Sequence, residues 1–102
     1  MNNQSIPQIG QIVKILRGKD AGQLAVVLTQ ADNKFVYIAD GDKRKFDQSK
    51  KKNLLHLESQ SYISSEVVNS LMENGRVTNG KLRYAVMMFR QSTESHAEQR
   101  GD

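Results

Sequence analysis

The side chains of this chain that could do chemistry are mostly lysines and arginines, because the groups used in catalysis and metal binding are scarce. There is no cysteine, which excludes disulfides, thiolate catalysis and cysteine-based zinc sites. The two histidines, His56 and His96, lie far apart in the sequence. No His-x-x-x-His pair or carboxylate cluster offers metal-ligand spacing, and no Gly-x-Ser-x-Gly nucleophile motif is present. We therefore expect a protein that is not an enzyme, with no metal, no cofactor and no small-molecule substrate.

The cations gather in two segments of the first half of the chain. Ten basic and six acidic residues precede residue 59, and five of each follow it, so the net charge of +4 lies in the first half. One segment surrounds a short turn and carries Lys14, Arg17 and Lys19, and the other, residues 43–52, carries six cations against Asp47 alone. Such clustering is typical of nucleic-acid-binding proteins, with a solvated lysine-rich loop as the alternative interpretation. If both segments lie at one end of the fold, they form a single surface that contacts phosphates in a salt-dependent way.

Two further side chains have alternative roles. Phe46, inside the second basic segment, either stacks on an unpaired base or folds back into the core. His56 lies between two leucines in a predicted strand, where a structural or surface role is favoured over catalysis.

The turn between Gly18 and Gly22 is the tip of a predicted β-hairpin rather than a nucleotide-binding loop. It lacks the Gly-Lys-Ser/Thr ending of such a loop, and a strand follows where a helix is needed. Apolar, β-branched runs on both sides of the turn are typical of a hairpin, and the two glycines are expected to shape its loop.

The first half of the chain predicts a mainly β fold. Short strands are expected over residues 9–16, 23–29, 34–39 and 53–58, with Val13 and Ile15 facing the interior. Strands of this length and spacing favour a small antiparallel barrel or strongly bent sheet over residues 8–58. Closure into a barrel would also remove the free edges of so small a sheet.

After residue 58 the apolar period becomes helical, which predicts a helical hairpin of two short helices over residues 61–91. Ser64 or Ser65 is expected to cap the first helix, with Asn74-Gly75 as its end, and Thr78 or Asn79 to cap the second. We expect this hairpin to pack on the outside of the barrel, against some of Ile12, Leu16, Leu28 and Val36; pairing with another chain is the alternative. Residues 92–102 are polar and aperiodic, which predicts a disordered tail.

The sequence also indicates where the protein works. Its first residues lack the basic and apolar regions of a signal peptide, and its longest apolar runs are too short to span a bilayer. We expect a cytoplasmic protein with no membrane partner.

The stretch Gly10-Gln-Ile-Val-Lys followed by Arg17-Gly-Lys-Asp-Ala-Gly22-Gln-Leu-Ala-Val-Val resembles the KOW motif, a strand–loop–strand unit of many ribosomal and transcription-elongation proteins. The likeness continues through Phe35-Val-Tyr-Ile-Ala-Asp-Gly41 and Lys52-Asn-Leu-Leu-His-Leu57. Over residues 8–58 the chain is similar to bacterial KOW-domain RNA-binding proteins related to the fourteenth-type archaeal and eukaryotic large-subunit ribosomal protein. The helical extension has no counterpart in this resemblance.

The resemblance implies an SH3-like barrel that contacts structured RNA, mainly ribosomal RNA. It implies that Gly22 is the glycine required by the KOW loop, that Arg17 and Lys19 are loop cations near RNA, and that residues 50–52 are a basic approach to the last strand. Taken with the charge pattern, the candidate RNA-binding residues are Lys14, Arg17, Lys19, Lys43, Arg44, Lys45, Phe46, Lys50, Lys51 and Lys52, with Gly18 and Gly22 as structural loop residues.

These observations predict an RNA-binding protein associated with the ribosome or its RNA, which recognises RNA shape more than sequence. The C-terminal helices could add a contact to a ribosomal or translation-associated protein. The alternative function is a protein–protein adaptor whose basic run meets an acidic partner or a transcription or translation factor.

Overall fold

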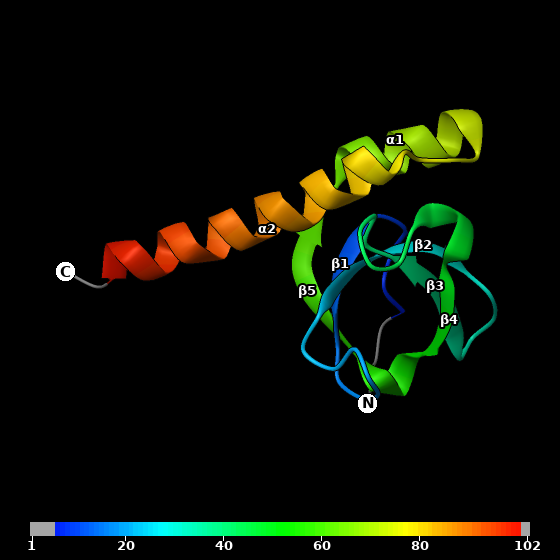
Figure 1. The fold of residues 1–102 in the computed structure, drawn as a ribbon, viewed down its shortest axis with the longest axis horizontal. Coiled ribbons are helices and arrows are strands. Elements are labelled where there is room, and N and C mark those ends of the chain that lie inside the picture. The colour runs from blue at the N-terminus through cyan, green and yellow to red at the C-terminus, as the bar shows by residue number, and fades with distance from the viewer. Residues whose placement is uncertain (1–5, 101–102) are drawn as a thin grey trace.

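The computed structural model describes residues 6–100, with the side chains of residues 6–93. Five strands come first and two helices follow (Figure 1). The strands and helices are β1 (Gln11–Ile15), β2 (Leu24–Gln30), β3 (Phe35–Ala39), β4 (Lys50–Asn53), β5 (Leu57–Ile63), α1 (Ser65–Asn74) and α2 (Asn79–Arg100). Two short 3-10 helices, η1 (Phe46–Gln48) and η2 (Leu54–His56), lie on either side of β4. The prediction of an antiparallel sheet followed by two helices is confirmed.

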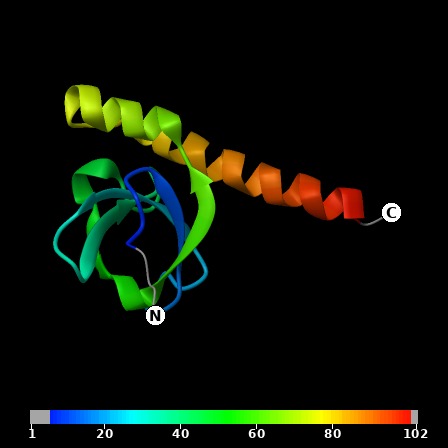
Figure 2. The ribbon, with the colours of Figure 1, turned by 180° about the vertical axis from the view of Figure 1, so that it is seen from behind.

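The five strands form one sheet in the order β4-β3-β2-β1-β5, and every neighbouring pair is antiparallel. The two edge strands are joined only by η2. In a flat sheet four spacings of ~4.8 Å would separate these edges by about 19 Å, whereas four residue steps reach at most ~14 Å. The sheet is therefore strongly curved, as Figures 1 and 2 show.

Both faces of the curved sheet are covered, which explains why its strands do not alternate cleanly between apolar and polar residues. The inner face holds one cluster of buried side chains: Val13, Ile15, Ala25, Val27, Val36 and Ile38. The outer face packs against the helices in a second cluster: Ile12, Val26, Leu28, Ala39, Val67, Val77, Leu82 and Ala85. Of the outer-face residues expected beneath the helices, Ile12 and Leu28 lie there. Leu16 is 47% exposed, and Val36 belongs to the inner cluster.

The end of the sheet differs from the expected strand over residues 53–58. The lysines of residues 50–52 form β4 themselves, Leu54–His56 is a 3-10 turn, and β5 continues to Ile63. One of the two edges of β5 and much of one face are exposed, so most of its residues are polar. Local sequence patterns therefore do not identify it as a strand. Its pairing with β1, in which Leu57 lies opposite Ile15, is a long-range contact that local patterns do not reveal.

The helix boundaries follow from local capping. The Ser64 hydroxyl accepts a hydrogen bond from the Val67 amide at 3.2 Å, and Gly75 ends α1 in the left-handed conformation. The Thr78 hydroxyl accepts one from the Lys81 amide at 3.2 Å. The helix α2 then continues to Arg100, over residues for which the sequence predicts a disordered tail; residues 101 and 102 lie outside the described part. Good helix formers and the absence of glycine and proline between residues 81 and 100 allow this extension.

The helices lie together across one side of the sheet, and the C-terminal part of α2 extends past it (Figures 1 and 2). In the part of the chain that the structure describes, neither helix has the run of apolar residues that crossing a bilayer would require.

Candidate nucleic-acid interface

Four cations line a small cavity beside the inner face of the curved sheet. Lys43 and Arg44 come from the loop between β3 and β4, and Lys50 and Lys52 come from β4 itself. Inner-face residues such as Ile15 form the floor. The cavity holds about 80 Å³, far below the several hundred Å³ of a typical small-molecule site. Its charged surroundings, rather than its interior, are therefore the candidate site.

The β1–β2 loop borders the same cavity, so the two basic segments meet. Asp20 and Gln23 of this loop line the cavity. The Lys52 ammonium donates a hydrogen bond to the Arg17 carbonyl oxygen at 3.3 Å, which ties β4 to the loop. Arg17 and Lys19 are exposed in this loop. We call the resulting set the basic rim: Arg17, Lys19, Lys43, Arg44, Lys50 and Lys52.

Two glycines shape the backbone of the β1–β2 loop. Gly18 and Gly22 have φ values of 95° and 90°, in the region that favours glycine. The Gly22 amide donates to the Ile15 carbonyl at 2.7 Å, and the Gln23 amide donates to the Asp20 carbonyl at 3.0 Å. These bonds close a compact loop.

Three of the predicted lysines lie away from the basic rim. Lys51 points to the other face of β4, since successive side chains of a strand alternate, and its ammonium lies 5.0 Å from the centre of the Phe35 ring. Lys14 has Leu24 and Glu58 as its neighbours in register, on the outer face of the sheet. Lys45 is exposed immediately before η1 and does not line the cavity.

The loop that carries Lys43 and Arg44 is held in place by its own aspartate. One carboxylate oxygen of Asp40 accepts hydrogen bonds from the Asp42 amide at 2.9 Å and the Arg44 amide at 2.8 Å. The Arg44 carbonyl in turn accepts from the Asp40 and Gly41 amides. These hydrogen bonds therefore fix the main-chain conformation from which the side chains of Lys43 and Arg44 extend.

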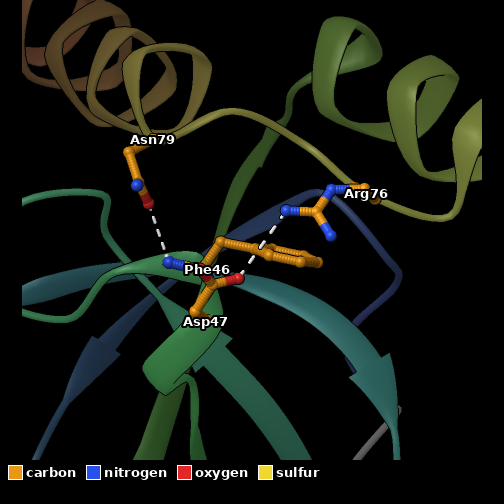
Figure 3. A network of polar contacts seen from close by, with 4 residues as sticks. All are labelled: Phe46, Asp47, Arg76 and Asn79. Atoms are coloured by element: carbon orange, nitrogen blue, oxygen red, sulfur yellow. Dashed lines mark hydrogen bonds and ion pairs between the residues drawn. The ribbon is translucent and has the colours of Figure 1, made fainter.

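The start of α2 and the link between α1 and α2 hold the other end of this loop (Figure 3). The Asn79 side-chain oxygen accepts a hydrogen bond from the Phe46 amide at 2.7 Å. The Arg76 guanidinium lies 5.4 Å from the centre of the Phe46 ring and 3.7 Å from the Asp47 carboxylate. The Phe46 ring also packs against the outer-face cluster. The ring is half-buried, and it also lines a largely apolar pocket together with Leu71 and Met72.

Sequence patterns gave no role to two arginines of α2 that lie close to this site. Arg83 and Arg90 line a groove of about 310 Å³ together with Lys43, and the apolar side chains of Leu24 and Met87 also line it. Their spacing of seven residues, which places both on one helix face, was the available signal. Only the tertiary packing of α2 brings them beside Lys43.

The described side chains also bear on metal binding. Through residue 93 they include no group of three His, Asp or Glu residues placed to hold a metal ion. No family model matches the chain.

A relative does match it. The chain is 44% identical over 71 residues to a protein of Bacillus subtilis (strain 168) named "Putative ribosome-binding protein YbzG". The matched stretch covers 70% of this chain and 96% of the relative. At this identity and coverage the chain belongs to the same protein family as YbzG.

Proposed function

We propose that this protein binds the ribosome by docking its basic rim on the phosphate backbone of structured ribosomal RNA. The observation that carries the proposal is the contact between Lys52 and the Arg17 carbonyl, which unites two basic segments that are distant in sequence. The name of the relative, which describes ribosome binding, supports the choice of partner. Such a role is non-enzymatic and cytoplasmic.

The proposal includes the finer assignment of the fold as an SH3-like barrel of the KOW type. The three-residue link between the edge strands supports it, because this link requires strong curvature. The left-handed φ of Gly22, at the position of the KOW glycine, supports it as well. A defined β1–β2 loop beside a basic edge strand suits recognition of RNA shape and phosphates more than base sequence.

The test is a double charge reversal, Lys43→Glu with Lys50→Glu. Both side chains are exposed and border the cavity. Because each contact to a phosphate releases counterions, we expect at least tenfold weaker binding to fragments of ribosomal RNA, measured by fluorescence anisotropy. We also expect loss of co-sedimentation with purified ribosomes.

The matched control is Lys34→Glu, on the β2–β3 turn. It changes the net charge in the same direction, but Lys34 borders neither the cavity nor the groove beside α2. We expect this variant to bind like the unmodified protein. Unchanged RNA affinity and ribosome binding in the double variant would reject the proposal. Lost RNA affinity with intact ribosome binding would also reject it, because the ribosome would then be bound elsewhere than at the basic rim. Lost ribosome binding with unchanged RNA affinity would favour the adaptor function, in which the basic run meets an acidic protein.

A further inference from the structure

We infer that helix α2 is part of the RNA-contacting surface, with Arg83 and Arg90 continuing the basic rim along the helix. This inference rests on the proposed function and extends its site. It assigns a role in phosphate binding to a half of the chain that carries no net charge. The partner is the backbone of the same structured RNA that docks on the basic rim.

The first argument is continuity. The small cavity inside the basic rim and the groove beside α2 share three lining residues, Gln23, Asp40 and Lys43. Lys43 therefore stands between the two depressions and belongs to both. An RNA backbone that contacts Lys43 on the basic rim would therefore meet α2 next.

The second argument is the charge along this path. The lining residues of the two depressions include six cations, Lys43, Arg44, Lys50, Lys52, Arg83 and Arg90, and three aspartates, Asp20, Asp40 and Asp42. One oxygen of Asp40 already accepts two backbone N–H groups, so part of its charge is satisfied within the loop. The path keeps an excess of positive charge, which favours a polyanion such as an RNA backbone as the partner.

The third argument is preorganisation. The Arg83 guanidinium donates a hydrogen bond to the Gly41 carbonyl at 2.7 Å, which fixes it against the loop that carries Lys43. Gly41 permits this approach, because a Cβ there would meet the Asn79 carbonyl oxygen and would lie 2.9 Å from the Leu82 Cβ. Arg90, two helical turns further and about 10 Å along the axis, is exposed. A bidentate guanidinium is well suited to phosphate.

The test uses the full chain carrying Arg90→Gln or Arg90→Glu, with ribosomal RNA fragments as the probe. We expect roughly tenfold weaker binding for Arg90→Glu and a smaller loss for Arg90→Gln. The slope of log affinity against log salt should fall by about one for the neutral variant. Lys34→Glu again serves as the charge control, and thermal unfolding by circular dichroism verifies that each variant is folded.

A proximity measurement gives an independent readout. A photo-crosslinking side chain placed at Met87, which lines the groove, should capture RNA. The same side chain at Met72, which is 77% exposed on α1 and lines neither the cavity nor the groove, should not.

The outcomes separate this inference from the proposed function. Normal RNA affinity in both Arg90 variants, with loss in the Lys43/Lys50 double variant, would overturn the inference and leave the basic rim intact. Equal crosslinking from Met87 and Met72 would also overturn it. Normal affinity in the double variant would overturn both, because α2 would then have no rim to continue.

Discussion

Two glycines with nearly the same backbone conformation have different reasons to be glycine. Gly22 has a φ of 90° and Gly41 a φ of 80°. A Cβ at Gly22 would meet no atom within 4 Å, so only the backbone conformation requires glycine there. At Gly41 a Cβ would also collide with the first turn of α2. This position therefore requires glycine both for its backbone conformation and for its lack of a side chain.

These surroundings predict unequal effects of the same substitution. Gly22→Ala should lower the free energy of unfolding by about 1–2 kcal/mol, the cost of a left-handed residue with a Cβ. Gly41→Ala should cost more, roughly 3 kcal/mol or above, because α2 must also move. Urea unfolding of the two variants measures the difference. Equal losses would mean that α2 does not rest on Gly41 as described.

At the scale of elements, the helices and the sheet share one core. Leu82 is fully buried between α2 and the outer face of the sheet. Leu82→Ala should therefore lower the free energy of unfolding by about 2–5 kcal/mol, through lost burial and a residual cavity. Leu55→Ala is the matched control, since Leu55 is 74% exposed and should change stability by less than about 0.5 kcal/mol. Similar stabilities for the two variants would contradict the packing of α2 on the sheet.

The elements that local chemistry determines could be predicted from the sequence. The first hairpin follows from glycines beside apolar runs, and α1 follows from its Ser64 cap and its Gly75 end. The length of β5 could not be predicted, because its polar residues are ordered by pairing with β1, more than forty positions earlier. The candidate site, too, could be predicted only in part from the sequence. Charge clustering identifies Lys50 and Lys52, but only the strand pleat separates Lys51 from them, and only tertiary packing brings in Arg83.

For the whole molecule, the six cations of the basic rim predict a steep dependence of RNA binding on salt. If each contacts one phosphate, affinity should fall about a thousandfold between about 50 and 200 mM salt. Titration of ribosomal RNA fragments at several salt concentrations measures the slope, and the Lys43/Lys50 double variant should have a slope smaller by about two. A shallow slope in the unmodified protein would indicate that few of these cations contact phosphate.

The place of β4 at one edge of the sheet has a consequence for solubility. An edge strand presents unpaired N–H and C=O groups to which a strand of another molecule can add, and charged side chains discourage such aggregation. Lys50, Lys51 and Lys52 occupy three of the four positions of this strand. Charge reversal at these positions keeps the edge protected by repulsion, whereas neutral substitution would leave it open to self-association. Lys50 and Lys52, which we propose to contact RNA, thus also help to keep copies of the protein apart.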